Sequence, residues 1–448
     1  MFLERTLINK LITWSKNPDR RPLLVEGARQ VGKTALLKKF GNEHFESCHY
    51  FNFERDSDLA LIFSGTLDPK HILVELGIKI QQKIDPNKSL IIFDEIQQCD
   101  RALTSLKYFS EDLKGSFVAC AGSLLGISLS KGSFPVGQVD RVTLYPISFF
   151  EFLLAHNELD LYESVRNIAT ATPPSPYLTE QLWSLMLDYF CCGGLPDSVV
   201  AWLTGPSKLE KIQNIKTTQE RIYKDYLADI AKHSGSESAM HIETVFRNIP
   251  AQLARAIDGS AKKFQFKQVI SGKKSFDELR GPIEWLTRAG LIHQVYIAEK
   301  ALSPLSAYCK DNRFKLYLFD LGMLRHLSGF EPQQIFAWGD NMYKGFYAEN
   351  YVLLELLSAG ASVPKAWHEG ESEIEFVLER ASELIPLEVK SSTNARSRSL
   401  SIYRERYKPA HTIILAGKTV VAPKPATDGK LNRRWPIFAA GSLDSEPL

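Results

Sequence analysis

The 448-residue sequence predicts an α/β protein of several domains, since a chain of this length corresponds to about three domains of ordinary size. Short apolar runs alternate with helical stretches up to about residue 155, as expected for a parallel sheet with functional loops at its strand ends. The strand signal then fades into a mostly helical section, and from about residue 340 strands and helices alternate again. The pattern therefore predicts two α/β units separated by a helical middle.

The composition excludes several classes of protein. With 44% hydrophobic and 24% charged residues, the chain is typical of globular proteins and not of disordered or collagenous ones. The 54 Lys and Arg nearly balance the 52 Asp and Glu, so any surface for nucleic acid must be local. Six cysteines without CxxC spacing indicate free thiols. No signal peptide or membrane-span pattern is found, so we expect a cytoplasmic protein with no membrane partner.

The first elements lead to a glycine-rich segment. Leu3, Leu7 and Leu11 have helical spacing, and the apolar run 23–25 predicts a buried strand. The segment GARQVGKT follows and matches the P-loop pattern GxxxxGK[ST], with a predicted helix over 35–44 behind it.

A P-loop in this strand-to-helix context predicts binding of ATP with Mg²⁺. Its backbone N–H groups face phosphate, Lys33 can reach the β and γ phosphates, and the Thr34 hydroxyl can ligate Mg²⁺. A glycine-containing turn without a ligand is the alternative. We assign a catalytic role to Lys33 and nucleotide binding to eight residues: Gly27, Ala28, Arg29, Gln30, Val31, Gly32, Lys33 and Thr34.

Two further apolar runs end in polar residues. The run 90–93 is followed by Asp94, predicted to position Mg²⁺, and by Glu95, predicted to be the base that activates water. Such a run is often only structural, but its place after a P-loop favours hydrolysis. The run 116–122 ends at Ser123, a candidate sensor of the γ phosphate, and Gln97 is a weaker candidate for that role.

The middle of the chain is predicted to be mainly helical. A turn-forming segment occupies 191–197, and a helix with Ile283 and Leu286 on its buried side stops at Gly290 before a strand over 291–297. A helix that runs into a hairpin is typical of a winged helix. We expect four parts: 1–155, a parallel-sheet domain; 156–235, a helical region; 236–330, a winged-helix-like domain; and 335–448, a second α/β domain.

The last part carries a second chemical motif. Glu388 and Lys390 lie two apart in a predicted strand and therefore share one face. Glu375 in the preceding hairpin strand and Glu349 on the helix before it can join them, giving predicted metal ligands Glu349, Glu375 and Glu388. Carboxylates with a lysine at this spacing suit metal-dependent phosphodiester hydrolysis, with Glu375, Glu388 and Lys390 as catalytic residues. An amphipathic hairpin with a solvated face is the alternative.

Two basic segments are candidate nucleic-acid surfaces, although a solvated helix face is the commoner explanation. One has tyrosines among its cations and comprises Arg396, Arg398, Tyr403, Arg404, Arg406, Tyr407 and Lys408. The other comprises Lys262, Lys263, Lys267, Lys273 and Lys274. Arg141 is a candidate arginine that acts on the nucleotide of a second copy; a solvated or paired surface arginine is the alternative.

The motifs GARQVGKT, IIFDEIQ, YPISFFEFL, GGLPD, KLYLFDLGML, GFYAENYVLLEL, EIEFV and PLEVKSS together resemble the AAA-type ATPases that carry a C-terminal DUF4143 domain. The resemblance implies an AAA+ P-loop domain, a winged-helix-like middle and a restriction-endonuclease-like C-terminal domain. The C-terminal set also resembles PD-(D/E)xK nucleases, except that Glu375 stands where the first acid is usually Asp.

Two functions are consistent with these motifs. The first is an ATP-hydrolysing protein in which nucleotide state controls a metal-dependent, nuclease-like or DNA-binding C-terminal domain. The second is a nucleotide-controlled switch or interaction protein whose C-terminal domain is catalytically inactive. A transport or membrane-remodelling ATPase is a weaker third hypothesis, because no membrane anchor is found in the sequence.

Overall fold

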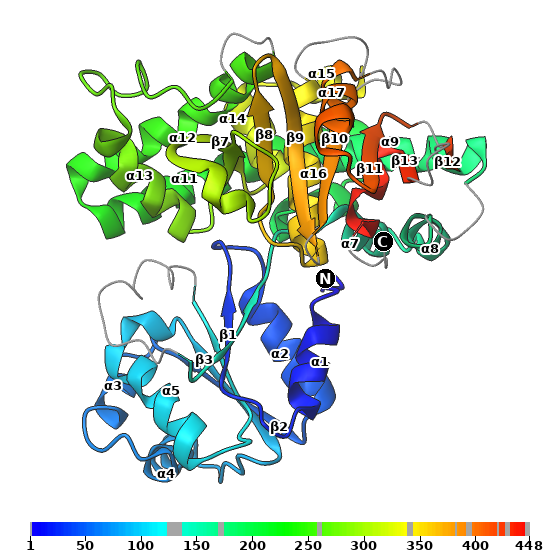
Figure 1. Ribbon diagram of the computed structural model, residues 1–448. Coiled ribbons are helices and arrows are strands. Elements are labelled where there is room, and N and C mark those ends of the chain that lie inside the picture. The colour runs from blue at the N-terminus through cyan, green and yellow to red at the C-terminus, as the bar shows by residue number, and fades with distance from the viewer. Residues whose placement is uncertain are drawn as a thin grey trace. The chain divides into compact units, whose positions relative to one another are not determined.

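The computed structural model describes residues 2–122, 137–168, 174–257, 262–337, 344–380, 383–390, 397–418, 421–425 and 431–443. The chain forms two compact units (Figure 1). Unit 1 comprises Met1–Tyr145 with Arg288–Gly290, and unit 2 comprises Pro146–Thr287 with Leu291–Leu448. Among the helices described, none has the length and apolar character needed to cross a membrane.

Unit 1 is built on a five-stranded sheet in the order β2-β3-β4-β1-β5. Every neighbouring pair is parallel, as the alternation of strands and helices predicts. The strands are β1 (Leu23–Glu26), β2 (Ser47–Asn52), β3 (Ser89–Asp94), β4 (Val118–Ala121) and β5 (Asp140–Thr143). The helices are α1 (Ile8–Lys16), α2 (Lys33–His44), α3 (Leu59–Ile62), α4 (Pro69–Ile80) and α5 (Asp100–Asp112), and a 3₁₀ turn, η1 (Ile96–Gln98), follows β3. The predicted apolar runs are therefore confirmed as strands.

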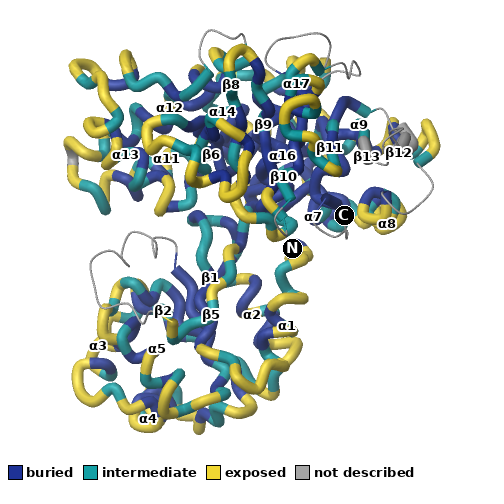
Figure 2. Tube along the Cα trace, viewed as in Figure 1, coloured by how far each residue is buried: buried dark blue, intermediate teal, exposed yellow. Residues whose placement is uncertain are grey.

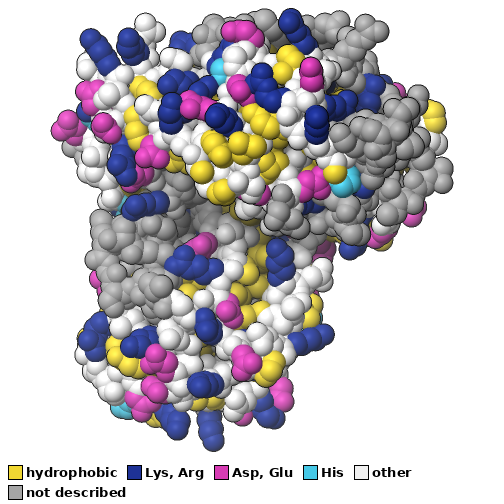
Figure 3. Space-filling model, in the orientation of Figure 1, with side chains coloured by type: hydrophobic (Ala, Val, Ile, Leu, Met, Phe, Trp, Pro, Cys, Tyr) yellow, Lys and Arg dark blue, Asp and Glu magenta, His cyan; other side chains and the backbone are white. Residues whose placement is uncertain are grey.

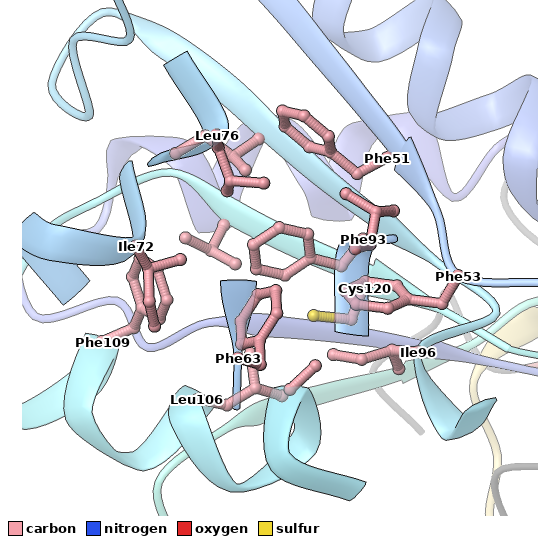
Figure 4. Packing of buried hydrophobic residues seen from close by; sticks show 14 of the residues in the cluster. Phe51, Phe53, Phe63, Ile72, Leu76, Phe93, Ile96, Leu106, Phe109 and Cys120 are labelled. Atoms are coloured by element: carbon pink, nitrogen blue, oxygen red, sulfur yellow. The ribbon is translucent and has the colours of Figure 1, made fainter. Parts of the chain in front are cut away.

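The core of unit 1 packs around Phe93 on β3 (Figure 4). The ring of Phe93 makes edge contacts with Phe63, at 5.8 Å between centroids, and with Phe109, at 6.1 Å. Burial of each such ring contributes roughly 1.5–3 kcal/mol. All six residues of β3 are buried, so packing holds the end of this strand, where Asp94 lies, in one place.

Unit 2 contains most of the described helices, and buried and partly exposed residues are mixed along the strands of its sheet (Figure 2). The helices are α7 (Phe149–Ala155), α8 (Leu159–Arg166), α9 (Pro176–Cys192), α10 (Pro196–Thr204), α11 (Lys208–Ser234), α12 (Ser236–Ile257), α13 (Phe276–Arg288), α14 (Leu321–Ser328), α15 (Pro332–Phe336), α16 (Lys344–Ala359) and α17 (Arg398–Tyr407). Two 3₁₀ turns, η2 (Leu305–Tyr308) and η3 (Ile437–Ser442), complete the set.

The GGLPD and FDLGM segments interlock in unit 2. The buried carboxylate of Asp320 accepts hydrogen bonds from the backbone N–H of Gly194, at 2.6 Å, and of Met323, at 2.8 Å. Gly193 has a φ of 72°, and a Cβ there would lie 2.3 Å from the backbone nitrogen of Gly322. Only glycine fits this position, so both segments serve the packing of α9 against α14.

The sheet of unit 2 has eight strands in the order β12-β13-β11-β10-β9-β8-β6-β7. They are β6 (Ile292–Ala298), β7 (Cys309–Leu318), β8 (Lys365–Glu369), β9 (Ser372–Arg380), β10 (Glu383–Lys390), β11 (His411–Ala416), β12 (Val421–Pro425) and β13 (Leu431–Trp435). The predicted β9–β10 hairpin is antiparallel, and β10 is parallel to β11.

The β6–β7 hairpin, which the sequence predicted as part of a winged helix, is joined to the C-terminal sheet. Helix α13 and strand β6 lie where the sequence predicts a helix and a strand, and β7 completes an antiparallel pair. However, Ile297 and Ala298 of β6 also pair with Ala366 and Trp367 of β8, so the hairpin extends the C-terminal sheet. The free edge of a strand pairs readily with another strand, which the local pattern of the hairpin does not reveal. The four-part division of the chain stays a prediction.

Candidate functional site

The GARQVGKT segment forms the loop between β1 and α2. Gly27 has a φ of 141° and Gly32 a φ of 97°, which other residues rarely adopt. A Cβ on Gly27 would lie 2.2 Å from the carbonyl oxygen of Leu144, so a side chain there would force the loop apart. Gln30 also has a positive φ, 62°, a strained conformation for a non-glycine residue that is often found at functional sites. The loop therefore has the tight path that a phosphate-binding loop requires.

Lys33 lies at the first turn of α2 and its side chain points back to the loop. Its Nζ donates to the carbonyl oxygens of Gly27, at 2.9 Å, and Ala28, at 2.8 Å. The residue is only 7% exposed, and burial lowers the pKa of its ammonium to about 8, against the opposing charges of Glu95 and Asp94. Two neutral carbonyls do not compensate a buried cation, so an anion at the loop would be bound strongly.

Asp94 ends β3 and is bonded to the loop. Thr34 Oγ1 donates to Asp94 Oδ2 at 2.8 Å, and the backbone N–H of Glu95 donates to Asp94 Oδ1 at 3.1 Å. The hydroxyl of Tyr50, on the neighbouring strand β2, donates to Asp94 Oδ2 at 2.7 Å. The structure thus brings together Thr34 and Asp94, the two residues of unit 1 that we predicted to position Mg²⁺.

Tyr50 is a site residue that the sequence patterns did not reveal. Burial and the hydrogen bond to Asp94 raise the pKa of its phenol to about 12, so it remains a donor at neutral pH. Asn52 Nδ2 donates to the Tyr50 oxygen at 3.0 Å, and Lys38 Nζ lies 3.5 Å from the centroid of the Tyr50 ring. The only signal in SCHYFN was its polar residues, and these become informative only once β2 is known to lie beside β3.

Glu95 directly follows β3 in a left-handed conformation, with a φ of 50°. Its carboxylate accepts a hydrogen bond from the amide of Gln97 in η1. Gln97, which we predicted as a weaker phosphate sensor, is therefore placed to hold Glu95. Ser123, the stronger sensor candidate, lies outside the described residues.

Arg141 lies within β5. Its Nη1 is 3.6 Å from Glu26 Oε1, and the side chain is about half exposed. Burial raises the pKa of Glu26, and the charge of Arg141 partly offsets this. The arginine thus has an acidic partner in its own chain, which fits the alternative of a paired surface arginine.

The second motif forms a buried cluster of charges in unit 2, which we call the carboxylate cluster. Its acids are Glu349 on α16, Glu373 and Glu375 on β9, and Glu388 on β10, and its lysines are Lys315 on β7 and Lys390 on β10. Burial, followed by the charges of Glu388 and Glu349, holds the pKa of Glu375 well above its usual range. The four residues that we predicted, Glu349, Glu375, Glu388 and Lys390, are therefore brought together.

Each predicted acid of the carboxylate cluster already has a protein donor. Lys390 forms an ion pair with Glu388, and Glu375 Oε2 accepts from the backbone N–H of Val389 at 3.1 Å. Burial opposes the charge of Lys390, but Glu375 and Glu388 outweigh it and raise its pKa. Glu388 is 1% exposed, and its Oε2 has no hydrogen-bond partner in the described part of the chain. That oxygen is open to a further ligand.

Lys315 and Tyr317 are members of this site that the sequence motifs did not include. Lys315 is 4% exposed, and its Nζ lies 2.5 Å from Glu373 Oε1 and 3.5 Å from Glu349 Oε2. The hydroxyl of Tyr317 donates to Glu349 Oε2 at 2.7 Å. Burial opposes the charge of Lys315, but Glu349, Tyr317 and Glu373 outweigh it and hold its pKa well above its usual range.

The charge balance of the carboxylate cluster bears on metal binding. Four carboxylates face two lysines, which leaves two negative charges when all are ionised. This excess and the unpartnered oxygen of Glu388 fit a divalent cation. However, no group of three or more His, Cys, Asp or Glu side chains in the described part of the chain is arranged to hold a metal ion. Lys315 and Lys390 stand between the carboxylates in this arrangement.

The basic segment after the ExK motif is folded against the protein. Tyr403 is buried and packs edge-on against Trp367, at 5.1 Å between ring centroids, and Tyr407 donates to Glu369 at 2.6 Å. Arg406 pairs with Glu369 at 2.7 Å. Tyr403 is therefore not available to stack on a base, and the partly buried Tyr407 lies beside it on the inner face of α17. Arg396 lies outside the described residues.

Family models match three stretches of the chain. A family model described as an AAA domain matches residues 19–153, a domain of unknown function, DUF8612, matches 184–334, and another, DUF4143, matches 344–435. No curated protein matches the chain. Residues 19–153 are thus similar to AAA domains, which supports nucleotide binding and hydrolysis, and residues 344–435 are similar to DUF4143 domains.

Two solved structures show distant similarity. AMPPCP-bound DnaA from Aquifex aeolicus is 13% identical, with 64% of this chain and 89% of that chain covered and a TM-score of 0.26. Drosophila ORC bound to DNA is 13% identical, with 72% and 84% covered and a TM-score of 0.23. At these scores neither structure supports an inference about this chain.

Proposed function

We propose that this protein binds and hydrolyses ATP at the loop 27–34, and that its nucleotide state controls a metal-dependent, nuclease-like C-terminal domain that acts on DNA. The observation that carries the first half is the 2.8 Å hydrogen bond from Thr34 to Asp94 beside the buried ammonium of Lys33. A hydroxyl, a carboxylate and a cation at a helix N-terminus are the groups that phosphoryl transfer requires.

Each residue of unit 1 has a distinct proposed role. The loop N–H groups and Lys33 bind the β and γ phosphates and compensate the charge that develops between them. Thr34 and Asp94 would hold Mg²⁺, which supplies further charge compensation when bound. Glu95, held by Gln97, accepts a proton from the attacking water.

In unit 2, the proposed catalytic group is the set Glu375, Glu388 and Lys390, with Glu349 as a further acid. A divalent cation would be held by the carboxylates, and it supplies charge compensation for a phosphodiester when bound. Lys390, whose charge is favoured by Glu375 and Glu388, stabilises negative charge on the phosphate. The raised pKa of Glu375 supports this proposal, since strongly shifted groups gather at functional sites.

One observation favours the second candidate function, a nucleotide-controlled switch with an inactive C-terminal domain. Lys315 already pairs with Glu349 and Glu373, so the cluster is partly neutralised by the protein itself. In addition, a Glu at position 375 in place of Asp extends the carboxylate by one bond, and a misplacement of about 1 Å can cost on the order of a hundredfold in rate.

One experiment separates the two functions. The full chain is incubated with branched, duplex and single-stranded DNA, with Mg²⁺ or Mn²⁺, in the presence and absence of ATP. Metal-dependent cleavage whose rate changes with ATP supports the nuclease. Nucleotide-dependent DNA binding without cleavage under every condition supports the switch.

A further inference from the structure

A second charged feature of unit 2 is a pocket of about 490 Å³ with mainly basic walls. Its lining includes the cations Lys262, Lys263, Lys310 and Arg313, and the acid Glu299. In the view of Figure 3, Lys and Arg side chains gather over the region where Figure 1 labels β7 and β8. Four cations against one acid leave three positive charges in the pocket, so its chemistry favours an anion.

The cations of the basic pocket form only weak ion pairs with protein carboxylates. Lys310 and Arg313 share Glu299, at 2.8 and 2.7 Å, and this carboxylate carries one charge for two cations. Lys262 pairs with Glu371, whose side chain is 96% exposed, and exposed pairs of this kind contribute little. Lys263 has no ion pair in the described part of the chain. An anionic ligand could therefore replace these ion pairs with little loss of free energy.

The basic pocket adjoins the carboxylate cluster. Arg313 of the pocket and Lys315 of the cluster are two residues apart on β7, about 7 Å along the strand. Arg313 contacts His368, and Lys315 pairs with Glu373. His368 and Glu373 lie directly opposite each other in the β8–β9 ladder, so the two sites share a boundary.

From this placement we propose that the basic pocket binds a backbone phosphate of DNA, next to the phosphate that is presented to the carboxylate cluster. The inference rests on the proposed function of unit 2 and identifies the part of the protein that holds the DNA. A polyanion is favoured over a small anion because the cations line an open pocket beside a site for a second phosphate. The pocket holds the strand, and the carboxylate cluster provides the chemistry.

The test measures DNA binding by fluorescence anisotropy over a range of salt concentrations, with the full chain and with a chelator to prevent cleavage. The double variant Lys263→Gln/Lys310→Gln removes two pocket cations. The double variant Lys216→Gln/Lys224→Gln is the matched control, because it removes the same charge from exposed positions on α11. Thermal unfolding checks that both variants fold.

Each neutralised phosphate contributes about 0.9 to the slope of log K against log salt. Because the pocket is proposed to hold one phosphate, we expect the pocket variant to lose up to about 0.9 from this slope and at least about tenfold in affinity, while the control behaves as wild type. Equal binding by the pocket variant and wild type would overturn the assignment of the pocket.

Two other results would also overturn it, for different reasons. If wild type binds no DNA of any form at low salt, the DNA-directed function of unit 2 fails and this inference fails with it. If wild type binds DNA but inorganic phosphate, at the same concentration of phosphate groups, displaces it completely, the pocket is a site for small anions and not for a DNA backbone.

Discussion

Thr34 and Asp94 lie 60 residues apart in the sequence, and the Thr34 hydroxyl donates a 2.8 Å hydrogen bond to the Asp94 carboxylate. The bond joins the start of α2 to the end of β3. Strand β4 lies between β1 and β3, so the parallel order of the sheet brings the two ends to the same edge. This relationship supports the ATPase proposal.

Lys33→Ala should abolish ATP binding. The substitution removes the cation that reaches the β and γ phosphates and leaves the loop carbonyls of Gly27 and Ala28 without their donor. Isothermal titration calorimetry measures the affinity, with Lys39→Ala as the control, because that lysine is on the same helix but pairs with Glu4. ATP binding by Lys33→Ala as tight as that of wild type would show that the loop is not the site.

ATP affinity should fall as the pH rises above about 8. Burial lowers the pKa of Lys33 to about 8 in the free protein, so at pH 9 only about one tenth of the molecules carry the cation. Bound phosphates favour the charged form, and binding must then take up a proton. We expect about tenfold weaker binding at pH 9 than at pH 7.

Calorimetry at pH 9 in buffers of different ionisation enthalpy detects this proton uptake. Lys33→Arg is the control, because a guanidinium stays charged over this pH range. If the variant and wild type show the same uptake, the titrating group is not Lys33.

Tyr50→Phe should weaken the binding of the Mg²⁺ that supports ATP turnover. The change removes the hydroxyl that donates to Asp94 Oδ2 and leaves the ring over which Lys38 lies. Loss of one hydrogen bond to a charged group costs about 1.5–3 kcal/mol. The Mg²⁺ concentration that gives the half-maximal rate should therefore rise at least several-fold. Tyr108→Phe on α5 is the control. An unchanged Mg²⁺ dependence would limit Tyr50 to packing.

Glu388→Ala and Lys390→Ala should each remove metal-dependent DNA cleavage. Glu388 provides the buried carboxylate with an unpartnered oxygen, and Lys390 provides the cation beside it. Glu405→Ala on α17 is the matched control for loss of a carboxylate, and circular dichroism checks the fold of all three. Cleavage that survives both substitutions would place the chemistry elsewhere.

The sequence indicated the residues around the loop 27–34 more completely than those of the carboxylate cluster. Two local patterns, the P-loop after β1 and the acids after β3, identify Lys33, Thr34, Asp94 and Glu95. In each pattern the end of a buried strand determines where the following residues lie. Tyr50 could not be found in this way. Its role depends on the order of strands in the sheet, which places β2 beside β3.

Lys315 illustrates the same difficulty in unit 2. It lies on β7, within the stretch 236–330 that the sequence assigned to a winged-helix-like domain, where lysines are commonly solvated. In the structure β6 joins that hairpin to β8, and Lys315 becomes buried between Glu349 and Glu373. A long-range strand pairing therefore decides the charge balance of the cluster, and no local pattern encodes it.

The measurement that tests the central claim most directly compares ATP binding with ATP turnover in Glu95→Gln. The side chain keeps its size and loses its basicity, so the variant should bind ATP as wild type does while steady-state phosphate release falls by about 10²–10⁴-fold. Gln97→Ala, which removes the amide donor of Gln97 but keeps the Glu95 carboxylate, should give a smaller loss. Phosphate release from Glu95→Gln at the wild-type rate, with ATP binding intact, would contradict the proposed catalytic role of the site.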